Sequence, residues 1–343
     1  MAADPRPVDQ VDFVPSYTAA ELQDLCRSGS ERIECAIASG REAAIAEYSK
    51  IEEASRWFCN LYAEWIRLTE EYLLTAKGRS ALLSAPGPER SAELAVRSGM
   101  TQDDLALASA IVAGPDNPLS QAFSQAFDGA DSGSALEVWV QFEQVMRKAH
   151  DFRRDLITDL LGFVYREHGL SGLEDAQAFA AERGPWVESM PAELALDPKM
   201  RLAELSFLLT VTCFFEFRIE ELADRWVLWA DPCGNCGRQL QDRYRPDEDW
   251  GFEIIDLPGP ATFGLDAVTV YQSHFALIHH VYAIQAVGVP CPAIRCAGLE
   301  AGSKPCEWHV YKDPTRSDPA FYEMVGAPIP GDPGSPSAGG AVG

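Results

Sequence analysis

The stretch CGNCG, residues 233–237, decides how this chain is organised, because it demands a particular chemistry. Two cysteines that are separated by two residues can bind one tetrahedral metal ion through their thiolates, and glycine lets the backbone curl around the sulfur atoms. The pattern is typical of a zinc knuckle. Redox dithiols use the same spacing, but they usually follow a strand and begin a helix. We expect a long helix to end just before Cys233, so zinc binding is the favoured interpretation.

Three later cysteines can complete the metal site, and the sequence does not rank them. Cys291 lies between prolines, which hold it rigidly. Cys296 is followed closely by a glycine, as in a knuckle, and Cys306 lies where a strand is expected to start. Two of these three would join Cys233 and Cys236 in a site of four thiolates. Such sites are closed and structural, so we predict a structural zinc ion as the cofactor.

A catalytic metal ion with an open coordination position is the alternative, and histidines are available for it. His274, His279 and His280 lie in one expected helix. His279 and His280 are adjacent and point about 100° apart, so they cannot share a face. His274 shares its face with Tyr271 and Tyr282, which makes it a candidate general base. The simpler interpretation of His274 is a partly buried imidazole with satisfied hydrogen bonds.

The composition bounds the class of protein. The chain has 343 residues, of which 47% are hydrophobic, and a formal net charge of -24. That charge repels phosphates, so we expect neither a nucleic-acid nor a membrane partner. No stretch approaches the roughly 18 apolar residues of a membrane span, and no secretory signal is visible. We therefore expect a cytoplasmic protein, in which the nine cysteines are thiols and metal ligands.

Helix patterns dominate the chain up to about residue 230, and the predicted fold class is mainly α. Capping boxes predict helix starts at Thr18, Ser28, Thr101 and Ser134. Long helical runs are expected over 28–77, with a break near Gly40, and over 134–168, ended by Gly169. A third run over 198–230 is apolar around most of its circumference. Residues 17–230 should therefore form a multi-helix, bundle-like body, preceded by a disordered tail over 1–16.

After the knuckle the pattern changes, and residues 231–312 are expected to form a small cysteine-rich, zinc-binding α+β module. A short strand is predicted within 251–257, a helix over 266–287 and a strand over 307–312. Residues 313–343 become rich in proline, glycine and serine, and we expect a tail there.

Three acidic residues recur at helical spacing in the expected apolar helix: Glu216, Glu220 and Asp224. If they are buried, they raise one another's pKa values, which is how acid–base carboxylates arise. Glu216 has the most apolar neighbours and is the strongest candidate. Alternatively the stripe faces water or pairs with arginines such as Arg218. The chain has no Glu-x-x-His pair, glycine-rich phosphate loop, G-x-S-x-G or H-E-x-x-H pattern, which removes the usual support for di-iron, nucleotide, serine-hydrolase and zincin functions.

Two classes of function are compatible with these patterns. In the first, the chain is an enzyme of small-molecule, specialised metabolism. Its pocket lies between the apolar helix and the histidine helix, where Glu216 and His274 perform acid–base chemistry, with Glu220 as a further catalytic candidate. Tyr282 or Tyr271 orients the substrate. This class requires that Glu216 and His274 line one cavity. In the second, the chain is a non-catalytic, zinc-stabilised binding or regulatory protein that recognises a basic partner, and the two residues lie apart.

Overall fold

The computed structural model describes residues 16–128, 132–231, 233–243, 252–302 and 304–331. The fold is mainly helical, as the sequence predicts, and it includes a small antiparallel sheet. Among these residues, no helix is long and apolar enough to cross a membrane. The tail predicted over 1–16 lies outside the described residues, except for Ser16.

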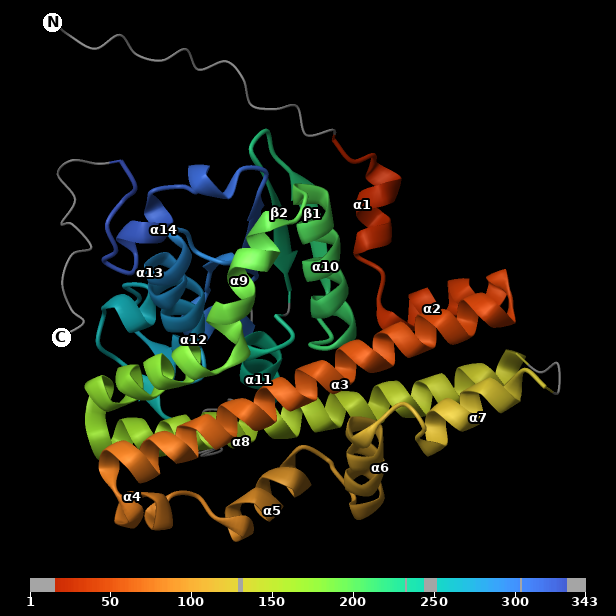
Figure 1. The fold of residues 1–343 in the computed structure, drawn as a ribbon, viewed down its shortest axis with the longest axis horizontal. Coiled ribbons are helices and arrows are strands. Elements are labelled where there is room, and N and C mark those ends of the chain that lie inside the picture. Colours follow the sequence, from red (N-terminus) through yellow and green to blue (C-terminus); the bar gives the residue numbers. More distant parts are fainter. Residues whose placement is uncertain (1–15, 129–131, 232, 244–251, 303, 332–343) are drawn as a thin grey trace, which may run out of the picture.

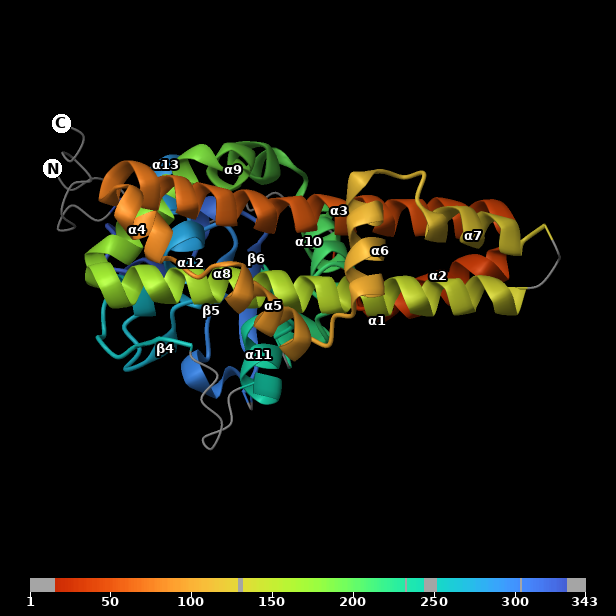
Figure 2. The same ribbon diagram turned by 90° about the horizontal axis from the view of Figure 1, so that it is seen from below.

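Two long helices, α3 (Arg41–Tyr72) and α8 (Ser132–Arg183), pack side by side and form the base of the molecule (Figures 1 and 2). The sequence predicts both of them. Gly40 precedes α3 with a φ of 112°, and Gly169 interrupts α8 with a φ of 69°. Glycine adopts such positive φ values without a steric penalty. After Gly169 the helix folds back across the top of its own first part (Figure 1).

Shorter helices surround this pair. They are α1 (Ala19–Leu25), α2 (Gly29–Ser39), the π-helix η1 (Leu73–Lys77), α4 (Arg79–Ser84), α5 (Pro88–Arg97), α6 (Gln102–Ala113), α7 (Pro118–Ala126), α9 (Pro185–Ala195) and α10 (Pro198–Val211). The capping boxes predicted at Thr18, Ser28 and Thr101 are all present. The helix predicted to start at Ser134 starts two residues earlier, within the ordinary uncertainty of a helix end.

The prediction of one helix over 198–230 is wrong beyond Val211. Helix α10 ends there, and an antiparallel hairpin of β1 (Phe217–Glu221) and β2 (Arg225–Ala230) comes next. Phe214 has a φ of 55°, which a right-handed helix does not accommodate. A short apolar run that is rich in aromatic and β-branched residues fits a buried strand as well as a helix, and periodicity alone does not separate the two.

The hairpin is part of a four-stranded sheet with the order β1-β2-β6-β5. Strand β6 (Cys306–Tyr311) confirms the strand predicted over 307–312, and it pairs with both β2 and β5 (Ala293–Arg295). The register places Ala230 opposite Cys306. The boundary that we proposed at residue 231 therefore runs through one sheet.

The remaining elements form the last third of the described chain. They are α11 (Cys236–Arg243), β3 (Ile254–Ile255), η2 (Pro260–Thr262), β4 (Val268–Thr269), α12 (Ser273–Ala276), the π-helix η3 (Leu277–Tyr282), α13 (Ala283–Val287), η4 (Gly298–Gly302), η5 (Pro314–Arg316) and α14 (Ala320–Glu323). Strand β3 confirms the strand predicted within 251–257. The helix expected from residue 266 starts only at Ser273, because Val268 and Thr269 pair with β3 instead.

One hydrophobic core connects the base to the sheet. It includes Tyr62 of α3, Leu161 of α8, Trp226 of β2 and Phe275 of α12. The tail predicted over 313–343 begins too early: its first part folds as η5 and α14, and Phe321 of α14 is fully buried. The end of that predicted tail, 332–343, lies outside the described residues.

Candidate functional site

A cluster of buried cysteine thiols lies where β2, α11 and β6 meet. The sulfur atoms of Cys233, Cys236 and Cys306 lie within 4.8 Å of one another, and the first two are 3.4 Å apart. Cys233 follows the end of β2, Cys236 begins α11, and Cys306 begins β6. The pairing of β2 with β6 thus brings together cysteines that are far apart in the sequence. This group could hold a metal ion.

Cys296 is next to this group. It follows the end of β5, and its thiol interacts with those of Cys236 and Cys306. Backbone amides donate to two of the sulfurs: Ala297 N lies 3.5 Å from Cys306 Sγ, and Gly298 N lies 3.4 Å from Cys296 Sγ. The thiols of Cys233, Cys236 and Cys296 together hold the pKa of the Cys306 thiol well below its usual range.

The arrangement of these thiols is compatible with a metal ion bound by Cys233, Cys236 and Cys306, whose sulfur atoms all lie within 4.8 Å of one another. The reason for discounting a redox dithiol, however, was wrong: a strand precedes the motif and a helix begins at Cys236. The redox interpretation is weakened instead by the neighbouring thiols of Cys296 and Cys306, and by the complete burial of Cys233 and Cys236, which prevents thiol exchange.

Gly234, between the two cysteines of the motif, lies against the preceding loop. A Cβ atom at this position would overlap the carbonyl oxygen of Cys213 and the ring of Phe215. The close approach of two backbone segments therefore requires glycine here.

Buried polar groups join the knuckle to α8. Asp151 accepts from Arg238 Nη2 at 2.7 Å and from Arg154 Nη1 at 3.0 Å, and His150 Nε2 is hydrogen-bonded to Asn235 Oδ1 at 2.9 Å. Burial alone raises the pKa of Asp151, but the two arginines and His150 lower it well below the usual value. These contacts fix the start of α11 on the helical base.

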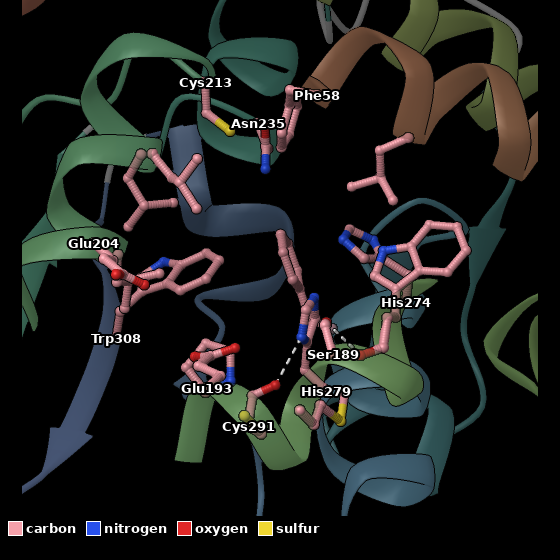
Figure 3. A pocket seen from close by; sticks show the side chains of 18 of the residues that line it. Phe58, Ser189, Glu193, Glu204, Cys213, Asn235, His274, His279, Cys291 and Trp308 are labelled. Carbon is pink, nitrogen blue, oxygen red and sulfur yellow. Dashed lines mark hydrogen bonds between the residues drawn. The ribbon is translucent and has the colours of Figure 1, made fainter. Parts of the chain in front are cut away.

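A cavity of about 520 Å³ lies beside the cysteine cluster (Figure 3). Asn235, a residue between the knuckle cysteines, is part of its wall, as is Cys213. Helices α3, α9, α10, α12 and η3 form most of the remaining wall. Eight aromatic side chains line it: Trp57, Phe58, Tyr62, Trp65, Trp186, Tyr271, Phe275 and Trp308. This size and this apolar character are those of a small-molecule site.

Two histidines in the wall have the same tautomer. His274 Nδ1 is hydrogen-bonded to the carbonyl oxygen of Tyr271, and His279 Nδ1 lies 3.0 Å from the carbonyl oxygen of Cys291. A carbonyl oxygen only accepts, so Nδ1 carries the hydrogen and Nε2 keeps a lone pair. Within the described part of the chain, neither Nε2 atom has a hydrogen-bond partner. Burial lowers the pKa of His274 to about 3 and also lowers that of His279, so both rings are neutral.

Charged groups gather on one side of the cavity. The Cys291 thiol is hydrogen-bonded to the Glu193 carboxylate, and burial and Glu193 both raise the pKa of Cys291. Burial raises the pKa of Glu193, against the opposing influence of Cys291 and Arg201. Arg201 Nη2 donates to the carbonyl oxygens of Tyr311, at 3.1 Å, and of Lys312, at 3.4 Å.

The structure separates the predicted acid–base residues. His274 lines the cavity, but Glu216 and Glu220 are exposed on and beside the β1–β2 hairpin, where Trp229 Nε1 donates to Glu220 Oε2 at 3.0 Å. Tyr282 is half-buried outside the cavity lining, and its hydroxyl donates to the carbonyl oxygen of Glu174 at 3.0 Å. The condition that Glu216 and His274 line one cavity is not met, because the helix that aligned the carboxylates does not exist.

Five cysteines were candidates for the metal site, and the structure divides them. Four gather in the cluster, and Cys291 lies in the cavity wall beside Glu193. Sequence reasoning missed Glu193 and Arg201, and it did not favour His279. A single acidic residue in a short helix carries no spacing pattern, so no local signal could have identified Glu193.

Comparisons with known proteins give no relative. No protein-family model matches the chain, and searches of curated proteins and of solved structures return no match.

Proposed function

We propose that this chain is an enzyme that binds a mostly apolar small molecule in the aromatic cavity and acts on it by proton transfer. One observation carries the proposal: a cavity of about 520 Å³ whose aromatic wall is interrupted by a few convergent polar groups. Apolar cavities with few, well-placed polar groups are the usual form of a substrate site. Large apolar cavities are costly to keep in a folded protein, which supports a role for this one.

Glu193 is the group that we assign to proton transfer. Its carboxyl group lines the cavity, and burial raises its pKa, which is the setting from which general acids and bases arise. His274 and His279 present unpaired Nε2 lone pairs and orient the substrate by accepting hydrogen bonds. Glu193 takes the role that the sequence had suggested for Glu216.

Zinc is the metal that we propose for the cysteine cluster, with Cys233, Cys236, Cys296 and Cys306 as its four ligands. An all-thiolate, closed and buried site favours zinc and has no open position for a substrate. Asn235 lies between two of the ligands and in the cavity wall, so the metal would hold part of that wall in place. The role of the metal is therefore structural.

A ligand screen tests the binding proposal. Purified protein is screened against a library of small apolar molecules by thermal shift, and each hit is repeated on Leu61→Trp, which fills the cavity, and on Leu83→Trp. Leu61 lines the cavity, whereas Leu83 is 74% exposed and outside its lining. We expect hits on the native chain and on Leu83→Trp that disappear in Leu61→Trp. Hits that persist equally in Leu61→Trp would show that the ligands bind elsewhere.

Turnover is tested separately from binding. Glu193→Gln keeps the shape of the side chain but cannot exchange a proton. For a hit that the native chain converts, we expect this variant to lose turnover by a factor of about 10² to 10⁴ when it is compared with the native chain at saturating ligand. Unchanged turnover would remove Glu193 from the chemistry. Ligand binding without any turnover in the native chain would instead favour the non-catalytic class of function.

A further inference from the structure

The polar part of the cavity includes several hydrogen-bond acceptors, beside the donors Trp65 Nε1 and Trp308 Nε1, which have no partner among the described residues. His274 and His279 each offer an unpaired Nε2 lone pair, and the carboxylates of Glu193 and Glu204 also line the cavity. Both histidines are neutral rings, and His274 is only 5% exposed. Figure 3 shows Glu193 and Glu204 on one side of the cavity and His274 on the other. A ligand that satisfies these acceptors must bring hydrogen-bond donors.

The balance of charge around the cavity is negative. Glu193 and Glu204 are near enough for the charge of Glu204 to raise the pKa of Glu193. Among the described residues that line the cavity, Arg201 is the only arginine or lysine. Its Nη2 atom already donates hydrogen bonds to carbonyl oxygens at the end of β6. With neutral histidines, two carboxylates face one guanidinium. The lining therefore has room for one further positive charge.

Aromatic side chains make up much of the same cavity lining. Trp308 lies on the same side of the cavity as Glu193 and Glu204 (Figure 3), and Trp57, Trp186 and Phe58 also belong to the lining. Tryptophan is the side chain whose ring face attracts cations best, and the attraction is larger where water is excluded. Trp57 is 48% exposed, so part of the aromatic lining is reached from solvent.

We propose that the cavity selects an apolar amine, bound as a monocation with its ammonium group beside Glu193 and its hydrocarbon part among the tryptophans. This inference rests on the proposed function, since it names the class of substrate for the same cavity. An ammonium group supplies the donors that the carboxylates and imidazoles lack, and it neutralises the surplus negative charge. An anionic ligand of the same shape would meet two carboxylates, and only Arg201, whose Nη2 already donates to carbonyl oxygens, could pair with it.

Three probes of one shape and different charge test the inference. The probes are 2-(1-naphthyl)ethylamine, 2-(1-naphthyl)ethanol and 1-naphthylacetate, titrated against the full chain at pH 7 by calorimetry. We expect the amine to bind at least about tenfold more tightly than the alcohol, and the carboxylate to bind most weakly. Glu193→Gln should reduce the preference for the amine over the alcohol by about tenfold. Glu188→Gln is the matched control, because Glu188 is exposed on the same helix and outside the lining.

The outcomes separate this inference from the proposed function. If the alcohol or the carboxylate binds as tightly as the amine, the cavity binds small molecules but the amine inference is wrong. If Glu193→Gln and Glu188→Gln weaken the amine equally, the effect is only that of net charge and the inference also fails. If none of the probes binds at millimolar concentration, both the amine inference and the proposed function are overturned. Should Glu193→Gln not fold, Trp57→Leu replaces it, and it must weaken the amine more than the alcohol.

Discussion

Gly234 is the position in the knuckle that tolerates no side chain. Its missing Cβ leaves space for the carbonyl oxygen of Cys213, a backbone atom that cannot move aside cheaply. We expect Gly234→Ala to lower the free energy of unfolding by about 2–3 kcal/mol, as overpacking does elsewhere, and to reduce the metal content of the purified protein. Gly87→Ala is the control, because nothing lies within 4 Å of its new Cβ. Urea unfolding of both variants makes the comparison, and equal stability would contradict the close approach.

The assignment of the fourth metal ligand is testable with two serine variants. Cys296 contacts the cluster, whereas Cys291 is hydrogen-bonded to Glu193 in the cavity wall. We expect Cys296→Ser to retain clearly less zinc than the native chain, and Cys291→Ser to retain as much. Elemental analysis and native mass spectrometry of the purified proteins give the zinc content per chain. Loss of zinc in Cys291→Ser but not in Cys296→Ser would reverse the assignment.

Among the helices and strands, capping residues predicted where helices begin more accurately than apolar runs predicted how far they extend. The boxes at Thr18, Ser28 and Thr101 specify helix starts through local hydrogen bonds, and the structure has helices there. The segment 212–230 lacks such local instructions. Its apolar residues are buried by pairing with β6, which lies far along the chain, so helical spacing of Glu216 and Glu220 was coincidental. Pairing with β6 therefore determines that this segment forms strands and not a helix.

The contact between α8 and α11 rests on buried charges, and its loss should be costly. Arg238 is 5% exposed and pairs with Asp151 at 2.7 Å. We expect Arg238→Met to lower the free energy of unfolding by about 3–5 kcal/mol, because it leaves a buried carboxylate with one partner fewer. Arg166→Met removes an exposed pair with Glu253 and should cost less than about 1 kcal/mol. Chemical denaturation of both variants tests this, and similar costs would mean that the buried network contributes little.

For the molecule as a whole, the two candidate sites were not equally predictable. The cysteine cluster could be identified in part, because the spacing of Cys233 and Cys236 is typical of metal ligands, whereas the choice among the later cysteines required the fold. The cavity could not, because its wall combines Phe58, Glu193, Arg201 and His279 from four elements that have no common spacing. Only the packing of α9 and α10 against α3 and η3 brings them together. The sequence identified His274 because it lies in an apolar segment. Its proposed partner, Glu216, was wrong because the helix predicted over 198–230 does not form beyond Val211.

The buried histidines make the whole molecule sensitive to acid. Burial lowers the pKa of His150 to about 4 and those of His274 and His280 to about 3, against 6.5 when exposed. His280 illustrates the cause: Nδ1 donates to Phe321 O, and Nε2 accepts from Ile294 N at 2.9 Å, a bond that protonation destroys. Because the folded pKa values are depressed, the unfolded chain binds protons first as the pH falls below 6.5. Stability is therefore full above that pH and is lost progressively toward pH 3 to 4.

Measurement of unfolding free energy against pH tests this expectation. Between pH 6 and pH 4, each histidine that stays neutral in the fold should contribute a slope of about 1.4 kcal/mol per pH unit. We expect His280→Gln to be less stable than the native chain at pH 7 but to show a shallower slope, because one titrating group is gone. His168→Gln is the control, since His168 is only half-buried and its Nε2 has no hydrogen-bond partner among the described residues. An unchanged slope in His280→Gln would mean that the pKa of His280 is the same in the folded and the unfolded protein.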